Sequence, residues 1–281
     1  MYKTIVVHVD GRPEQESRMR AAAVLAADQG AHVVGSAATG ISWFDFALLT
    51  SNIGAPIPAD DFTVMREAAV QRLQGFTEQA AHLGIASSEA RLAEDVADAC
   101  LLLQSRYADL VILSQDADGG PATDAPARVR GLPERVSLRG TRPVLVVPDA
   151  WRGAALPGTV VAGWDGGPCA LRAIAAALPL LQRTDSVKLA LVNPEHLPGL
   201  HGEEPGADMA LYLARHGVKV EVVVERTGAT AGNTLAALAR DCGAGLMVSG
   251  AYGHNRFREW VLGGVTRELL ERAPVPLLIA H

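Results

Sequence analysis

The chain repeats one sequence pattern twice. Residues 3–14 read KTIVVHVDGRPE and residues 158–169 read GTVVAGWDGGPC, so each copy is an apolar run that ends in Asp-Gly. A stretch rich in alanine and leucine, with the spacing of a helix, follows each run. A repeat of this kind predicts two copies of one structural unit rather than a single continuous domain.

The later parts of the two copies correspond as well. Residues 108–116 (ADLVILSQD) parallel 244–252 (AGLMVSGAY), and 141–149 (TRPVLVVPD) parallel 274–281 (PVPLLIAH). The apolar runs do not alternate in polarity, which is typical of parallel strands covered by helices on both faces. Each half therefore predicts an α/β fold, a doubly wound, Rossmann-like sheet of five parallel strands, with the two copies related by a pseudo-twofold axis.

Proline and glycine mark the junction between the copies. Residues 148–158 (PDAWRGAALPG) predict a linker, which gives domains at residues 1–149 and 156–281. Residues 40–60 have no counterpart in the second copy, and we interpret them as a surface loop or lid that packs its aromatic side chains on the body, or as a cover for a ligand or partner. The apolar strands at 143–147 and 276–280 are expected to pair with each other or across a homodimer.

Composition restricts the class of protein. The 281 residues carry a net charge of −6, all of it from residues 1–150, because 151–281 hold equal numbers of basic and acidic side chains. Neither half has the basic excess that nucleic-acid binding needs. Three cysteines without a CxxC pair predict no disulfide framework and no zinc site. No apolar run is long enough to span a membrane and no signal peptide is evident, so we expect a cytoplasmic protein.

Four glycines near the end of the chain are placed where a phosphate could bind. Gly250 follows an apolar strand, Gly253 closes a tight loop, and Gly263 and Gly264 precede a helical stretch that runs to Pro274. Ligands of open parallel sheets bind beyond the carboxyl ends of the strands, and a helix start presents free N–H groups and a positive dipole to an anion. The alternative is that these glycines serve only as turns and caps.

The closing segment resembles the universal stress protein family, whose ATP-binding members carry G-x2-G-x9-G-[S/T] at this place. Here the pattern is Gly250-x2-Gly253-x9-Gly263-Gly264, and the resemblance extends over both copies. It implies a stress-response protein that binds ATP, with Mg²⁺, in its C-terminal domain, and that acts as a nucleotide-dependent sensor with an unidentified protein partner. The resemblance places Asp165 near the adenosine, Val192 beside the adenine ring, and Gly250, Gly253, Gly263 and Gly264 at the phosphates. Further candidates beside the motif are His254, Val265 and Thr266.

This chain departs from the family pattern at one position. Gly264 stands where the family has serine or threonine, so a hydroxyl that would bind phosphate is missing. The loss of one such hydrogen bond costs about 1 kcal/mol, or roughly five-fold in affinity, and Thr266 in the first helical turn could supply a hydroxyl instead. We therefore expect weakened rather than abolished binding. His254 could reach a phosphate or lie on the surface.

The first copy lacks the glycine pattern. Gln115 stands where Gly250 stands, although Asp10 keeps the position of Asp165. Carboxylates follow where phosphates would lie, and they would repel a triphosphate or, alternatively, hold a metal ion: Asp116, Asp118 and Asp124. We predict a degenerate copy that does not bind ATP in the same way.

No catalytic signature is present in the sequence. The chain has no GxSxG, no HExxH and no Walker lysine. At most a weak ATPase is expected. The alternatives to a sensor are a slow ATP hydrolase or phosphotransferase, and a nucleotide-free structural or chaperone-like module.

Overall fold

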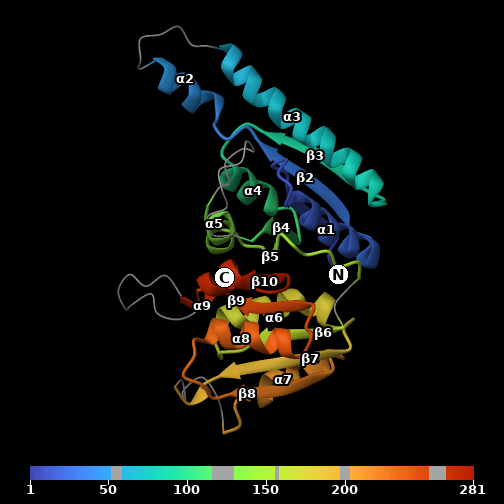
Figure 1. Cartoon of the computed structure of the whole chain (residues 1–281), viewed down its shortest axis with the longest axis vertical. Coiled ribbons are helices and arrows are strands. Elements are labelled where there is room, and N and C mark those ends of the chain that lie inside the picture. The colour runs from blue at the N-terminus through green and yellow to red at the C-terminus, as the bar shows by residue number, and fades with distance from the viewer. Residues whose placement is uncertain (52–58, 116–129, 156–157, 197–202, 253–263) are drawn as a thin grey trace.

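Strands and helices alternate within each half of the chain, except that two successive helices follow the second strand of the first half (Figure 1). The computed structural model describes residues 1–51, 59–115, 130–155, 158–196, 203–252 and 264–281. No helix within these residues is long and apolar enough to cross a membrane. The first half contains β1 (Thr4–His8), α1 (Gln15–Gln29), β2 (His32–Ala38), α2 (Trp43–Ser51), α3 (Ala59–His82), β3 (Ser88–Ala93), α4 (Ala97–Ser105), β4 (Leu110–Ser114), α5 (Leu132–Arg139) and β5 (Val144–Val147). The second contains β6 (Thr159–Gly163), α6 (Pro168–Leu181), β7 (Ser186–Val192), α7 (Ala207–Arg215), β8 (Val220–Glu225), α8 (Ala231–Asp241), β9 (Leu246–Gly250), α9 (Gly264–Arg272) and β10 (Leu277–Ala280).

All ten strands form one sheet, in the order β3-β2-β1-β4-β5-β10-β9-β6-β7-β8. Within each half the strands are parallel, as predicted. The halves meet at β5 and β10, which are antiparallel, with Leu145 opposite Leu278. Because the strand order of the second half mirrors that of the first, the two copies are related by a pseudo-twofold axis that passes between β5 and β10, at the middle of the molecule in Figure 1.

The pairing of β5 with β10 decides between the two alternatives for the last strands. Strand β5 lies between β4 and β10, and strand β10 lies between β5 and β9. These strands therefore pair with each other inside the chain, and they offer no free edge to a homodimer. The edges of the sheet are β3 and β8.

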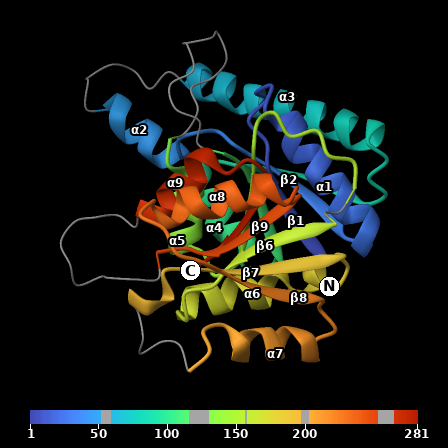
Figure 2. The same ribbon diagram turned by 60° about the horizontal axis from the view of Figure 1, so that its bottom comes forward.

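Two apolar cores lie on opposite faces of the sheet, and each runs through both halves. One core contains side chains of α1, α3, α6 and α7, and the other contains side chains of α4, α5, α8 and α9. Figure 2 shows α8 and α9 on one side of the strands of the second half, and α6 and α7 on the other. Successive side chains of strand β5 point to opposite faces of the sheet, so this strand contributes to both cores. Leu145 and Val147 belong to the first core, and Val144 and Val146 belong to the second. The two copies are thus joined by strand pairing and by continuous packing.

Residues 40–60 contain helices where we expected a loop. Trp43–Ser51 form α2, and Ala59 begins α3. The rings of Trp43 and Phe46 lie 5.1 and 5.6 Å from that of Phe62 on α3, so these aromatics pack on the start of a helix instead of on the body. The missing counterpart in the second copy led to the loop interpretation, whereas leucines, alanine and aromatics in this stretch can build a helix wherever a neighbouring helix covers them.

The predicted linker is held against α1. The carbonyl oxygen of Asp149 accepts hydrogen bonds from Ser17 Oγ at 2.5 Å and from Arg152 Nη1 at 2.9 Å. The ring of Trp151 packs on the core that contains α1. The domain limits at 149 and 156 themselves stay a prediction.

Candidate functional site

Both copies form the same turn after their first strand. Asp10 Oδ1 accepts the N–H of Arg12 at 3.1 Å, and Asp165 Oδ1 accepts that of Gly167 at 2.8 Å. The glycine that follows each aspartate has a positive φ, 72° at Gly11 and 76° at Gly166, which a residue with a side chain rarely adopts. The repeated Asp-Gly pair therefore has a structural role in both halves, since it makes the sharp turn from strand to helix.

In the second copy, predicted site residues come together at one edge of the sheet. Asp165 follows β6, Val192 ends β7 and Gly250 ends β9, and these three strands are neighbours in the order β9-β6-β7. The chain runs from β6 outward to β7 and β8 and then returns to β9 on the other side, so β6 and β9 form a topological switch point, where such sheets bind ligands. Three further predicted residues lie outside the described residues: Gly253, His254 and Gly263.

Gly250 has a structural reason to be glycine. A Cβ atom added to it would lie 2.5 Å from the backbone nitrogen of Ala170 and 2.7 Å from the carbonyl carbon of Cys169. Both are backbone atoms at the start of α6, so neither can move aside as a side-chain tip could. The end of β9 touches α6 closely because position 250 has no side chain, whether or not a ligand binds there.

The start of α9 is open and carries no carboxylate. Gly264 is its first residue, and a Cβ there would meet no described atom within 4 Å. Val265 is 37% exposed, and the first turn contains no acidic residue. Thr266 is buried, and its Oγ1 accepts the N–H of Tyr252 at 3.0 Å, which ties α9 to the end of the β9 segment, where Tyr252 has a left-handed φ of 57°. The Thr266 oxygen thus has a structural partner in addition to any ligand.

The two described glycines of the motif should respond oppositely to alanine. Gly250→Ala is expected to lower the free energy of unfolding by about 1 to 3 kcal/mol, because it forces backbone atoms apart. Gly264→Ala is expected to leave it unchanged or raise it by up to about 1 kcal/mol, since alanine favours a helix and the space is free. Urea denaturation followed by circular dichroism measures both. Equal effects of the two substitutions would contradict the packing role of Gly250.

The first copy has no glycine at the corresponding strand end. Gln115 follows β4, and its Nε2 donates to the carbonyl oxygen of Ala273 in the second half at 3.1 Å. The side chain that replaces Gly250 is therefore a contact between the halves. The acidic residues predicted to follow it lie outside the described residues: Asp116, Asp118 and Asp124.

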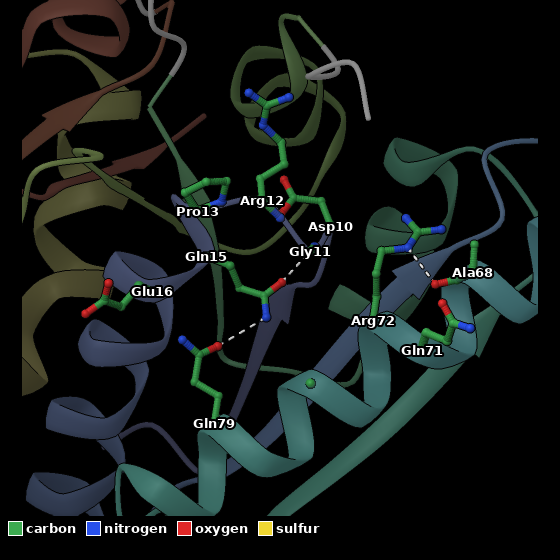
Figure 3. Close-up of a pocket in the computed structure, with 11 residues that line it drawn as sticks. Asp10, Gly11, Arg12, Pro13, Gln15, Glu16, Ala68, Gln71, Arg72 and Gln79 are labelled. Atoms are coloured by element: carbon green, nitrogen blue, oxygen red, sulfur yellow. Dashed lines mark hydrogen bonds between the residues drawn. The ribbon is translucent and has the colours of Figure 1, made fainter. Parts of the chain in front are cut away.

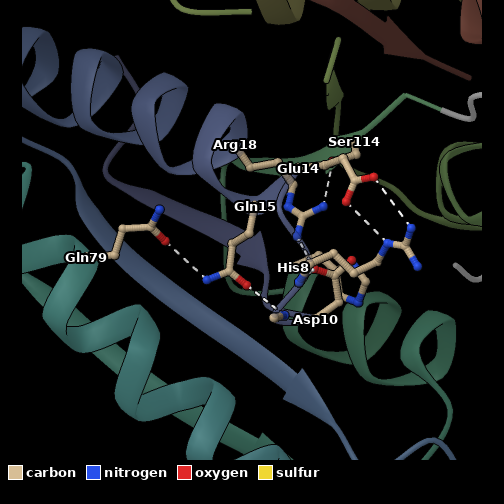
Figure 4. Close-up of polar contacts among 9 residues, drawn as sticks. His8, Asp10, Glu14, Gln15, Arg18, Gln79 and Ser114 are labelled. Carbon is tan, nitrogen blue, oxygen red and sulfur yellow. Dashed lines mark hydrogen bonds and ion pairs between the residues drawn. The ribbon is translucent and has the colours of Figure 1, made fainter. Parts of the chain in front are cut away.

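An arginine occupies the space beside Asp10 in the first copy. Arg18 is 1% exposed, forms an ion pair with Asp10 and donates to Ser114 Oγ at the end of β4 (Figure 4). In the second copy Ala173 stands at the same spacing from Asp165, so the arginine has no equivalent there. The switch point of the first copy is thus closed by a protein cation, which agrees with a degenerate copy.

This buried network shifts two pKa values. Burial alone would raise the pKa of Asp10, but Arg18, His8 and the hydrogen bonds from Arg18 and Arg12 outweigh it and hold that pKa below its usual value. Burial first, and then Arg18 and Arg72, lower the pKa of His8 to about 4, against the smaller opposing effect of Asp10. His8 is therefore neutral at physiological pH.

The shift of His8 predicts a loss of stability in mild acid. Because the pKa is about 4 in the folded chain and 6.5 in the unfolded chain, the unfolded state binds more protons below pH 6.5. The free energy of unfolding should therefore fall as the pH drops through this window, by about 2 kcal/mol between pH 7.5 and 5. Denaturant midpoints of the wild type and of His8→Asn test this, and the variant should lose this part of the slope. An unchanged slope in His8→Asn would refute the assignment.

Sequence reasoning missed Arg18, although a signal for it exists. Arg18 lies four residues before Ala22 and seven before Leu25, which places it on the buried stripe of α1. A charged residue at a core position of a helix requires a buried partner. Asp10 is the first acidic residue of the chain, at the end of the first apolar run, and the next one is Glu14. The sequence therefore offered Asp10 as the candidate partner of Arg18.

The fold defines a tandem pair of doubly wound α/β domains, in which a buried arginine lies at the switch point of the first copy and an alanine takes its place in the second. Residues 158–281 match the sequence profile of the Universal stress protein family. This match covers the second half of the chain, and over its full length the chain has the fold of a solved universal stress protein.

Comparison with solved structures supports the fold over the full length. A universal stress protein from Archaeoglobus fulgidus DSM 4304 is 14% identical with a TM-score of 0.72, and the match covers 99% of this chain and 97% of that chain. A functionally unknown protein from Pseudomonas aeruginosa PAO1 is 12% identical with a TM-score of 0.58, covering 99% and 92%. No protein with a curated description matches the chain.

Proposed function

We propose that the C-terminal domain binds ATP, with Mg²⁺, and that this occupancy makes the protein a nucleotide-dependent sensor. The observation that carries the proposal is the convergence at the β6/β9 switch point, within the residues that match the family. Asp165, Val192 and Gly250 lie at the ends of adjacent parallel strands, and the open start of α9 follows β9 along the chain. The cytoplasmic location expected from the sequence is part of the same proposal.

The start of α9 suits a phosphate group. A nine-residue helix that begins at Gly264 presents N–H groups and the positive end of its dipole. Its first turn holds no acidic side chain to repel an anion, and position 264 has no side chain to block one. Backbone N–H groups would hold the phosphates here, because the hydroxyl of the family pattern is absent and Thr266 Oγ1 already accepts from Tyr252.

The adenosine would lie toward β6 and β7. The Asp165 carboxylate is partly exposed at the end of β6, and its Oδ1 is positioned by the hydrogen bond from Gly167. Val192, also partly exposed, offers an apolar surface to a base. Bound Mg²⁺ would offset the charge of the triphosphate.

One nucleotide per chain is expected, because the first copy differs from the second both beside the aspartate after its first strand and at the strand end that carries Gly250 in the second copy. Arg18 already neutralises Asp10, and Gln115 takes the place of Gly250 and reaches Ala273. A triphosphate in the first copy would have to displace a buried ion pair.

Two measurements on the full chain test the proposal. Protein as purified is denatured and the released small molecules are identified, and the nucleotide-free chain is then titrated with ATP and Mg²⁺ by calorimetry. Binding of one ATP per chain, lost in Asp165→Ala and Gly264→Asp, is the expected result. Two ATP per chain would mean that the first copy binds as well. No binding up to about 1 mM would refute the proposal.

A further inference from the structure

The N-terminal domain contains a cavity of about 730 Å³ on the face of the sheet that α1 and α3 cover. Figure 3 shows it between the turn after β1, the start of α1 and the middle of α3. Its volume is that of a pocket for a small molecule. It is lined mostly by polar side chains, and all of its lining residues belong to the first half of the chain.

Arg72 is a positively charged residue that lines the cavity. Its guanidinium is half-buried and donates to the carbonyl oxygens of Ala68 at 3.1 Å and Ala38 at 3.3 Å. Within the described part of the chain no carboxylate lies within 4.0 Å of it. The stem packs on Gly11, where an added Cβ would lie 2.9 Å from Arg72 Cγ. The turn and α3 thus hold this cation in place at the cavity.

The other charged residues of the wall already have partners. Asp10 is paired with Arg18, Arg12 with Glu14, and Glu16 with Arg20. Among the described residues Asp10 attracts Arg72 electrostatically without an ion-pair contact, so N–H groups of the Arg72 guanidinium can still contact an anion. A partly desolvated cation of this kind favours an anionic ligand.

Amide groups stand beside the cation. Gln15 accepts the N–H of Gly11 at 3.0 Å and donates to Gln79 Oε1 at 3.2 Å, which orients the Gln79 amide (Figure 3). The NH₂ group of Gln79 can therefore donate to an oxygen of a ligand, as can that of Gln71 on the same helix. In the view of Figure 4, Gln15 and Gln79 lie to the left and Ser114, which accepts from Arg18, lies to the right.

We propose that this cavity is a second ligand site, which takes a small oxyanion, a carboxylate or phosphate group, on Arg72, with further polar groups of the molecule on the glutamine amides. The site is independent of nucleotide binding in the C-terminal domain. Carboxylates and phosphates share the oxygen acceptors that a guanidinium and amides recognise, and the experiment distinguishes between them.

The test is calorimetric titration of the full chain with inorganic phosphate and, separately, with succinate at constant ionic strength. At least one of these anions is expected to bind once per chain more tightly than about 10 mM. Arg72→Gln should weaken this binding roughly ten-fold or more, and Arg72→Lys, which keeps the charge, should weaken it less. Arg66→Gln is the matched control, because Arg66 lies on the same helix, is paired with Glu94 outside the cavity and should not matter.

Circular dichroism and the melting temperature of each variant establish that it is folded. If neither anion binds, or if binding survives Arg72→Gln, the proposal is wrong. If binding is lost in Gly264→Asp and kept in Arg72→Gln, the anion occupies the C-terminal domain, and the proposal is wrong as well. A response to phosphate alone or to succinate alone assigns the class of ligand.

Discussion

Arg18→Met is expected to lower the free energy of unfolding by about 3 to 5 kcal/mol, because it leaves the mostly buried Asp10 carboxylate at the cavity wall without its ion-pair partner. Arg18 is 1% exposed and also donates to Ser114, so the substitution removes both of these contacts. Methionine keeps most of the length of the side chain, which limits the cavity and isolates the loss of charge. A loss of this size is a large part of the stability of an ordinary domain.

Arg20→Met is the matched control for Arg18. It lies two residues further along the same helix and pairs with Glu16 at the surface, where 38% and 45% of the two side chains are exposed. Its replacement should change the free energy of unfolding by no more than about 0.5 kcal/mol. In Arg18→Met combined with Asp10→Asn much of the stability should return, because no buried charge is left unpaired. Urea denaturation at pH 7.5 measures all three. Equal losses in Arg18→Met and Arg20→Met would contradict the structural role of the network.

Gly264→Asp is expected to weaken ATP binding roughly 100-fold, since two unit charges about 5 to 6 Å apart repel by about 3 kcal/mol at an effective dielectric constant near 20. The chain should remain folded. The position is open, and a carboxylate in the first turn of α9 is favourable to the helix itself by about 0.3 to 1 kcal/mol. A stable protein that has lost its nucleotide is therefore the expected phenotype, as measured by melting temperature and by calorimetric titration with ATP and Mg²⁺.

Two further substitutions at the same position separate charge from shape. Gly264→Asn has the size of aspartate without its charge and should lose much less affinity. Gly264→Ser restores the hydroxyl of the family pattern and should tighten binding roughly five-fold, because one neutral hydrogen bond contributes about 1 kcal/mol. If Asp and Asn weaken binding equally, the start of α9 does not hold the phosphates. If none of the three changes binding, the nucleotide lies elsewhere.

The predicted site residues stay a prediction, but the structure shows packing roles for some of them that the sequence did not indicate. The motif glycines were grouped as one phosphate site, yet the two described ones differ. Gly250 is required by its contact with Ala170, whereas a Cβ at Gly264 would meet no described atom within 4 Å. The repeated Asp-Gly pairs were recognised in the sequence. The hydrogen bonds that their carboxylates accept from the N–H groups of Arg12 and Gly167 could not be predicted from it. Arg18 and Arg72 were missed, because a helical pattern assigns a residue to a face without saying which charged groups meet there.

The doubly wound architecture was determined by the sequence itself. Apolar runs without alternation require helices on both faces of a parallel sheet, and a run that recurs after about 155 residues requires that architecture twice. These local patterns are complete within each copy, which is why the strand directions and, apart from helix α2, the order of the elements were predicted correctly. The match of residues 158–281 to the universal stress protein family also follows from the sequence alone.

Only the tertiary structure decided how the two copies join and that an arginine lies at the switch point of the first copy. Strands β5 and β10 carry free edges in either isolated copy, and an edge can be satisfied by any strand of suitable register. Pairing inside the chain is selected because it also lets two cores run without interruption from one half to the other. Arg18 likewise contacts both Asp10 and Ser114, because folding brings the ends of β1 and β4 next to the start of α1. Ser114 is distant in sequence from the other two residues, so this contact depends on the tertiary structure.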